Sequence, residues 1–435
     1  MRIVKLEELD FGTIIRPGNT VAWNMGCGEP LSLSRRLIEQ RHAVGGIFNL
    51  VLGTIYSDTV RPEHCDVIRV TSVAGSGPSR KLAEAGKLDI LPVAVSEFAG
   101  LIRSRRLPVD VALVQLAEDP ATGELSYGAV NAYGPDLLHS ARIVIAEINS
   151  QTPFTGSCVP VDRDRITLAV RTDVPMVELK ERAGDARDAQ IASHVASLVP
   201  DGGVLQIGMG SLPRAVLRAL RGHRDLGVLS GGMGDDCVDL IEAGVITNAR
   251  KKADPGVSVT GLLLGSRKVY DFAHRNPAVR VDPVSYTHDF NVLSACDRLI
   301  AINSAIEVDL TGQANGEVAG GKYLGAVGGQ AEFIRGAKAA DGGLAILALA
   351  STTSRGQSRI VPRIPSGIVS TSRADIDCVV TEYGVAHLRG CALSERARRL
   401  IAIAHPDHRD ALERAARCEP GSRTFYPTHQ EEINP

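Results

Sequence analysis

The sequence predicts an α/β protein made of two related open α/β domains. Short runs of Val, Ile and Leu alternate with stretches of helical periodicity, which favours buried sheets covered by helices. Two patterns of the first half also return in the second half. The predicted strands include 109–115, 142–147, 203–207, 298–302, 344–348 and 376–381, and the predicted helices include 31–40, 186–197, 214–220, 238–243 and 393–403.

The first repeated pattern is a strand that ends in Gly-x-Gly and is followed by a proline and a helix. It reads GCGEP over 26–30 and GMGSLP over 208–213. The second pattern is an apolar strand followed by an acidic turn, Thr-Gly and small residues, over 110–128 and 297–317. Gly-x-Gly turns also arise independently, so the repeats favour duplication without requiring it.

We expect the two halves to join near residues 180 to 190, where charged residues are dense. This predicts an N-terminal domain over 1–185 and a C-terminal domain over 186–435. Each would be large enough to bury its own core.

Composition excludes several classes of partner. The 48 basic and 50 acidic residues give a net charge of −2, and aromatic residues make up 4%, so neither nucleic acid nor an anionic membrane is expected. Apolar runs such as 344–350 are far shorter than the roughly 18 to 20 residues of a membrane span. The N-terminus is acidic and does not read as a secretory signal. The 8 cysteines form no C-x-x-C pair, which favours reduced thiols, a cytoplasmic location and no metal site.

Two glycine-rich turns are candidate anion cradles. The turn over 208–213 lies where a predicted strand ends and a helix begins, so its backbone N–H groups would attract a phosphate or a developing anion. The loop over 325–330, GAVGGQ, has enough glycine to present successive N–H groups as an oxyanion hole. Each is equally well explained as a tight turn chosen for its dihedral angles.

Six further segments occur in a specific order: 239–248 (DLIEAGVITN), 310–313 (LTGQ), 328–337 (GGQAEFIRGA), 358–362 (SRIVP), 380–390 (VTEYGVAHLRG) and 401–407 (IAIAHPD). Together with 26–30, 107–115 and 144–149 of the first half, they make the chain resemble the acetyl-CoA hydrolase/transferase family. This family includes 4-hydroxybutyrate and butyryl-CoA:acetate CoA-transferases. The resemblance extends from about residue 15 to about residue 415.

The resemblance implies the fold of the CoA-transferase superfamily, with coenzyme A bound mainly by the C-terminal half. It implies an enzyme that uses acyl-CoA as substrate, with a small carboxylate as candidate acceptor and no tightly bound cofactor, and a homodimer or larger homo-oligomer. Carried over by position, the residues that contact the cofactor are Gly208, Met209, Gly210, Ser211, Leu212, Gly328, Gly329 and Gln330. Gly328 and Gly329 are also the predicted oxyanion donors.

This sequence departs from the family at the catalytic position. The resemblance implies a glutamate in the phrase Thr-Glu-Met, which attacks the acyl thioester and then becomes a glutamyl-CoA thioester. Counting back from Asp239 without a gap places Gly231 there, and a shift of one residue places Gly232 there. Neither has a carboxylate, so we expect the glutamyl-CoA relay not to run. We also expect Gly231 to leave a pocket for a water or a longer acyl chain.

Four residues are candidates to replace the function of the missing glutamate. Asp235 and Asp236 follow the position by four and five residues, about 13 to 18 Å in extended chain. Ser230 is adjacent, with no histidine near it in sequence, and Glu317 would serve as a general base. For each of them a structural role is the competing explanation.

Three functions stay open on this basis. The first is an acyl-CoA enzyme of the transferase/hydrolase family that acts on the thioester of a small carboxylic acid. The second is a hydrolase in which water attacks the thioester, or a β-ketoacyl carbon–carbon bond, because both reactions develop charge on an oxygen. The third is a non-catalytic acyl-CoA-binding or partner subunit.

Overall fold

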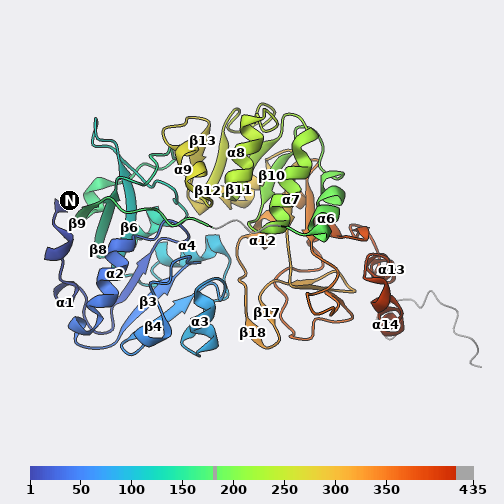
Figure 1. The fold of residues 1–435 in the computed structure, drawn as a ribbon, viewed down its shortest axis with the longest axis horizontal. Helices are drawn as coiled ribbons and strands as arrows, with labels where there is room; N and C mark the ends of the chain where they lie inside the picture. The colour runs from blue at the N-terminus through green and yellow to red at the C-terminus, as the bar shows by residue number, and fades with distance from the viewer. Residues whose placement is uncertain (180–183, 418–435) are drawn as a thin grey trace, which may run out of the picture.

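The structure is a computed structural model that describes residues 1–179 and 184–417. It confirms the predicted α/β class: two large, mainly parallel sheets lie side by side along the long axis of the molecule (Figure 1). Every strand of the first sheet comes from residues 2–172, and every strand of the second comes from residues 204–387. The exact boundary at 185/186 stays a prediction.

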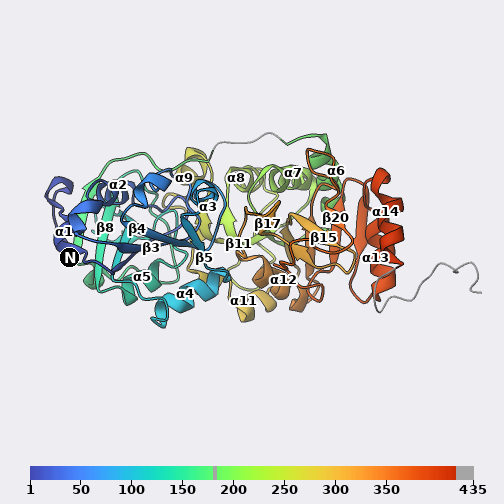
Figure 2. The same cartoon turned by 90° about the horizontal axis from the view of Figure 1, so that it is seen from below.

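The first sheet has the order β1-β9-β8-β6-β2-β3-β4-β5, with β7 paired to β6. Its helices lie on both faces, with α2 on one side and α4 and α5 on the other (Figure 2). The bounds are β1 (Arg2–Ile3), β2 (Thr20–Trp23), β3 (Phe48–Leu52), β4 (Ile68–Ser72), β5 (Leu88–Ile90), β6 (Val111–Glu118), β7 (Leu125–Ser126), β8 (Ile143–Asn149) and β9 (Leu168–Thr172), and α1 (Phe11–Ile14), α2 (Leu31–Glu39), α3 (Ser79–Glu84), α4 (Val95–Arg103) and α5 (Gly134–Ser140).

The second sheet has the order β13-β12-β11-β10-β14-β19-β21-β22. On one side of it lie α6, α7 and α8, and on the other α11 and α12 (Figure 2). Its strands are β10 (Val204–Ile207), β11 (Gly227–Met233), β12 (Ser258–Leu263), β13 (Val279–Val281), β14 (Leu299–Asn303), β19 (Leu344–Ala348), β21 (Cys378–Thr381) and β22 (Gly384–His387).

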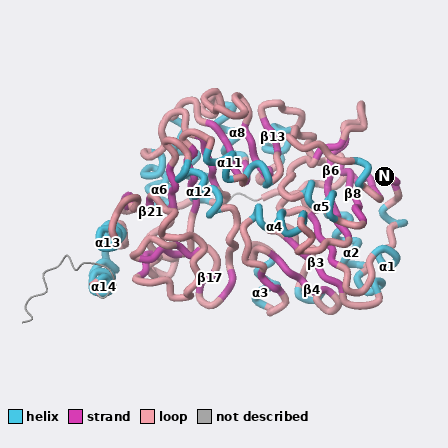
Figure 3. Tube along the Cα trace, turned by 180° about the vertical axis from the view of Figure 1, so that it is seen from behind, coloured by secondary structure: helices cyan, strands magenta, loops and turns pink. Residues whose placement is uncertain are grey.

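The helices of the second half are α6 (Ala186–Ala196), α7 (Ser211–Ala219), α8 (Asp235–Glu242), α9 (Arg267–Ala273), α10 (Val284–Thr287), α11 (Phe290–Ser294), α12 (Gln330–Ala339), α13 (Leu393–Ala402) and α14 (Pro406–Ala416). Figure 3 shows α13 and α14 beside each other at the far end of the second sheet. Small sheets are formed by β15 (Glu307–Asp309), β16 (Ala314–Asn315) and β20 (Ile360–Val361), and by β17 (Val318–Ala319) and β18 (Lys322–Tyr323).

Parallel strands covered on both faces need apolar residues at nearly every position. Strand β6 meets this requirement, because seven of its eight residues are buried. One hydrophobic cluster runs through both halves: Val130 of the first half and Leu262 and Leu264 of the second belong to it. None of the helices formed by the described residues is long and apolar enough to cross a membrane.

Two helices begin earlier than predicted. Helix α7 begins at Ser211 instead of 214, because Pro213 falls in its first turn, where the missing N–H costs no hydrogen bond. Helix α8 begins at Asp235 instead of 238, because acidic residues suit the first turn of a helix. Both starts bring the helix N-terminus closer to the ends of β10 and β11.

Candidate functional site

The two Gly-x-Gly turns occupy matching places in the two sheets. Strand β2 lies between β3 and β6, and β10 lies between β11 and β14, so the strand order reverses at each of them. In open parallel sheets, ligands bind beyond the carboxyl ends of strands at such reversals. Residues 26–28 follow β2, and residues 208–210 follow β10. The sequence repeat therefore has a structural counterpart at the position where a ligand is expected.

The turn after β10 leads directly into α7. Gly210 has φ +133°, a conformation that favours glycine, and Ser211 and Leu212 are the first two residues of the helix. Met209 is 41% exposed and lies beside the end of β11, where a Cβ added at Gly232 would be 3.9 Å from its Sδ atom. The first N–H groups of a helix have no partner within the helix. The turn is thus built as the sequence predicts, and its role in binding coenzyme A stays a prediction.

The carboxylates that follow β11 have structural partners. Asp235 accepts hydrogen bonds from the backbone N–H of Ser266 (2.9 Å) and Val269 (3.1 Å). Asp236 is mostly buried and pairs with Arg214 (Nε to Oδ2, 2.8 Å) and with Arg218 (Nε to Oδ1, 3.4 Å). These contacts favour the structural explanation over a role as replacement nucleophile.

Ser230 also has structural partners. Its side chain is fully buried, and its Oγ donates to the carbonyl of Ile207 (3.2 Å) and accepts from the N–H of the same residue (3.3 Å). The hydroxyl therefore ties β11 to β10. This geometry favours a structural role for it as well.

The expectation of an empty pocket at Gly231 is wrong. A Cβ added there would lie 3.3 Å from Cε1 and Nε2 of His288 and 3.4 Å from Cε2 of Phe333. The two rings lie 4.6 Å apart, centroid to centroid, and fill the space in front of the glycine. Gly232 points the opposite way, as strand alternation requires, toward Leu262, Leu264 and Met209.

His288 is a residue that sequence reasoning missed. It follows α10, is only 7% exposed, and its Nδ1 lies 2.9 Å from Oγ1 of Thr287. Burial lowers its pKa to about 4, so the imidazole is neutral at neutral pH. No local signal marks it, because the residues that it meets, Gly231, Gly329 and Phe333, are distant in sequence.

The glycine-rich loop brings a second glycine to the same imidazole. A Cβ at Gly329 would lie only 2.5 Å from Nε2 of His288, although the φ of Gly329 is an ordinary −95°. Gly329 is therefore required by space. Gly328 has φ +62° with open space around it, so it is required by backbone conformation. Gly231, Gly329 and His288 are thus brought together, and Gly329 is the N-cap of α12.

Backbone contacts hold this loop against the N-terminal half. The carbonyl of Gly328 accepts from the N–H of Val95 (3.2 Å), at the start of α4, and the carbonyl of Gly325 accepts from the N–H of Gly75 (3.0 Å). The side chain of Gln330 donates to Oγ1 of Thr371 (2.8 Å). The predicted oxyanion loop is therefore positioned by both halves of the chain.

Glu317 lies at the base of the same loop. Its buried carboxylate accepts a hydrogen bond from Ser370 (2.6 Å) and another from the hydroxyl of Tyr323. Its backbone carbonyl accepts from the N–H of Leu324 (2.7 Å) and Gly325 (3.0 Å). These bonds favour the structural role, and its role as a general base stays a prediction.

A cavity of 590 Å³ lies between α4, the α10–α11 region and α12, and His288 is part of its wall. Glu332 lines it too, accepting a hydrogen bond from the side chain of Ser96 through Oε1, while its buried Oε2 has no partner among the described residues. Burial raises the pKa of this carboxyl group above its usual value. Arg103 and Arg335 add positive charge to the wall.

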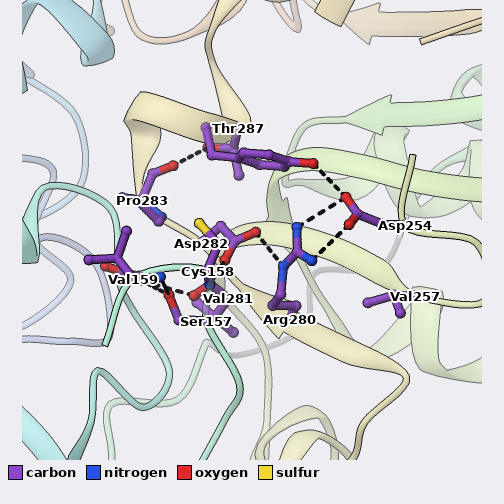
Figure 4. A network of polar contacts seen from close by, with 12 residues as sticks. Ser157, Cys158, Val159, Asp254, Val257, Arg280, Val281, Asp282, Pro283 and Thr287 are labelled. Carbon is purple, nitrogen blue, oxygen red and sulfur yellow. Dashed lines mark hydrogen bonds and ion pairs between the residues drawn. The ribbon is translucent and has the colours of Figure 1, made fainter. Parts of the chain in front are cut away.

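An ion-pair network positions α10 just before His288 (Figure 4). Arg280 donates to Asp254 (2.7 and 3.0 Å) and to the fully buried Asp282 (2.6 Å). Tyr286 donates to Asp254 (2.6 Å), and Thr287 donates to the carbonyl of Pro283 (3.3 Å). These contacts hold the residues before α10 and the residues within it, and so position Thr287.

Metal ligands are not gathered in this part of the molecule. Across residues 1–179 and 184–417, no group of three or more His, Cys, Asp or Glu side chains could hold a metal ion. The expectation that the site works without a metal stays a prediction. The polar side chains on the cavity wall are those of His288, Arg103, Arg335, Glu332, Asp289, Ser96 and Ser285.

The comparisons with known proteins agree with the fold. The N-terminal domain of the acetyl-CoA hydrolase/transferase family matches residues 3–178, and its C-terminal domain matches residues 265–416. The 4-hydroxybutyrate coenzyme A transferase of Clostridium kluyveri is 38% identical over 392 residues, which cover 88% of this chain and 90% of the relative. The acetyl-CoA hydrolase of Kluyveromyces lactis is 25% identical over 94% of this chain and 88% of its own.

A solved structure, RipA from Yersinia pestis, superposes with a TM-score of 0.90 at 31% identity, covering 96% of this chain and 97% of that one. Similarity of this extent, in sequence and in structure, spans both sheets and the segment between the two matched domains. The chain belongs to the acetyl-CoA hydrolase/transferase family.

Proposed function

We propose that this enzyme acts on the CoA thioester of a small carboxylic acid and that water receives the acyl group. The observation that carries the proposal is what lies next to Gly231: the three atoms nearest to a Cβ added there belong to the imidazole of His288 and the ring of Phe333, and none to a carboxylate. The nearby carboxylates of Asp235 and Asp236 are held by other partners. The family membership supports an acyl-CoA substrate, and relatives include both transferases and a hydrolase.

In this reaction, the backbone does most of the binding. The turn over Gly208, Met209, Gly210, Ser211 and Leu212 would hold the phosphate-bearing part of coenzyme A at a helix N-terminus. Gly328, Gly329 and Gln330 would line the thioester, with the two glycine N–H groups facing the carbonyl oxygen. Water attacks the carbonyl carbon, the C–S bond breaks, and the products are a carboxylate and free coenzyme A.

Four further properties belong to the proposal. The chain forms a homodimer or larger homo-oligomer, works in the cytoplasm, has no tightly bound cofactor and binds coenzyme A mainly through residues 186–435. The family membership supports the first and last of these. A size-exclusion measurement with light scattering and a binding titration with coenzyme A test them.

The decisive experiment measures thiol release and acyl exchange separately. The purified protein is mixed with acetyl-, butyryl- and β-ketoacyl-CoA, with and without acetate or succinate. We expect free thiol at a rate that does not depend on the acceptor, and no covalent CoA adduct on any Asp or Glu by mass spectrometry. Acceptor-dependent exchange with such an adduct refutes the proposal. Tight binding without either reaction identifies a non-catalytic acyl-CoA-binding subunit instead.

A further inference from the structure

We infer that His288 is a catalytic residue of this chain, and that its Nε2 takes the proton from the water that attacks the thioester. The inference rests on the proposed function and adds a residue to it. His288 is 7% exposed, and it lies between Gly231 and Gly329, the two glycines that the sequence places at the reacting centre. A side chain at either glycine would meet the imidazole. The imidazole of His288 therefore fits in this position because residues 231 and 329 are both glycine.

The hydrogen bonds favour a proton on Nδ1 of His288. The hydroxyl of Thr287 donates to the carbonyl of Pro283 (3.3 Å), as in Figure 4, and a hydroxyl has only one proton to donate. Its Oγ1, 2.9 Å from Nδ1 of His288, then accepts from Nδ1–H in the tautomer that the inference requires. The neutral imidazole then presents an unprotonated Nε2, which is the form that a general base needs.

Nε2 faces the N-terminus of α12. That helix runs over ten residues from Gln330, and its N-cap is Gly329, whose Cβ position lies 2.5 Å from Nε2. The first N–H groups of the helix have no partner within it and carry partial positive charge. Nε2 therefore lies beside Gly329, one of the two predicted oxyanion donors. In the proposed step, an O–H bond of the water breaks and its proton goes to Nε2. The water oxygen bonds to the carbonyl carbon of the thioester, and the electron pair of the C=O bond moves to the carbonyl oxygen. The C–S bond then breaks, and the imidazolium returns the proton to the thiolate of coenzyme A.

His288 forms part of the wall of the 590 Å³ cavity, and the inference takes this cavity as the route by which water reaches the imidazole. The charged groups on that wall are Arg103 of α4, Asp289, and Glu332 and Arg335 of α12. Ser96 and Ser285 are the other polar side chains on it, and Phe333 packs against the ring. These two arginines and two acids line the cavity, and none of the four has a hydrogen bond or ion pair with the imidazole.

The test replaces His288 by Gln and by Asn, with His139→Gln as the matched control at an exposed histidine outside the site. Loss of a general base lowers kcat by about 10² to 10⁴-fold. We expect that loss for both variants in acceptor-independent thiol release, with KM and coenzyme A binding within a factor of three and circular dichroism unchanged. Thr287→Val tests the positioning role: kcat should fall and its pH profile should change, and Thr287→Ser should restore both.

Four outcomes are distinguishable. If the wild type releases thiol and both His288 variants keep its rate, the inference is wrong and the proposed function stands. If the wild type releases none, the function fails and the inference with it. Nitrogen-15 NMR of the imidazole, which needs no turnover, should show Nδ1–H; a proton on Nε2 overturns the inference. If both variants unfold, the NMR result and Thr287→Val decide.

Discussion

Gly329→Ala places a methyl group against the imidazole of His288, and its cost can be worked out from the structure. The added Cβ lies 2.5 Å from Nε2, whereas such atoms prefer about 3.5 Å, so something must move by about 1 Å. Movement of the ring is restricted on one side by Phe333, whose ring centroid lies 4.6 Å from that of the imidazole. Overpacking of this kind costs about 1 to 3 kcal/mol of unfolding free energy.

The backbone adds nothing to that cost, because Gly329 has φ −95°. When the clash is removed by His288→Ala, the same change should therefore stabilise the protein by about 0.4 to 1 kcal/mol, through the less flexible unfolded chain. The sign of the effect reverses between the two backgrounds. This reversal measures the contact directly, as a double-mutant cycle does.

Gly328→Ala is the matched control. Its φ of +62° makes alanine unfavourable by about 1 to 2 kcal/mol, and the surrounding space is open, so this cost should be equal with and without the imidazole. Urea unfolding at 25 °C, followed by circular dichroism, gives the free energies of the two backgrounds and of both glycine variants in each. If Gly329→Ala costs the same in both backgrounds, the imidazole is not where the structure places it.

Three further predictions concern the same region. Gly231→Glu alone should not create acceptor-dependent CoA exchange, because a Cβ added at this position lies 3.3 Å from the imidazole of His288. Gly231→Glu combined with His288→Ala should gain exchange and a covalent adduct detectable by mass spectrometry. Exchange by the single variant would contradict this prediction. Asp235→Asn should lower the unfolding free energy by about 1 to 3 kcal/mol, because the carboxylate accepts two backbone hydrogen bonds, and should leave kcat per folded molecule unchanged. The free energy of unfolding should fall as pH drops from about 6.5 through 4, because burial lowers the pKa of His288 in the folded protein to about 4. The contribution of His288 that is lost over this range is about 3 kcal/mol. In urea unfolding at different pH, His288→Asn should remove this part of the pH dependence.

The parts of the fold that the sequence could predict are those governed by local pattern. The strands at 203–207 and 344–348 match β10 and β19 within a residue, because a buried parallel strand is apolar along its whole length. The predicted starts of α7 and α8 lie three residues late, because proline and aspartate occur in turns as well as in the first turn of a helix, so Pro213, Asp235 and Asp236 do not mark the boundary.

The site divides in the same way. Gly210 and Gly328 could be predicted from the sequence, because turns with positive φ favour glycine. Gly329 has an ordinary φ, and the reason for its glycine is His288, which approaches it only in the folded chain. The content of the space at Gly231 was therefore beyond any local pattern, since it depends on three separate segments packing together.

The backbone pairing of Gly325 and Gly328 with Gly75 and Val95 has a consequence for how the molecule can be divided. The proposed oxyanion donors, Gly328 and Gly329, lie in the C-terminal half, yet their loop is held by hydrogen bonds from the N-terminal half. A fragment that begins after residue 185 would retain the proposed coenzyme A-binding turn and lose the hydrogen bonds that position this loop. Proteolytic nicking of the connection, with the fragments kept associated, should spare turnover, and separating the fragments should end it.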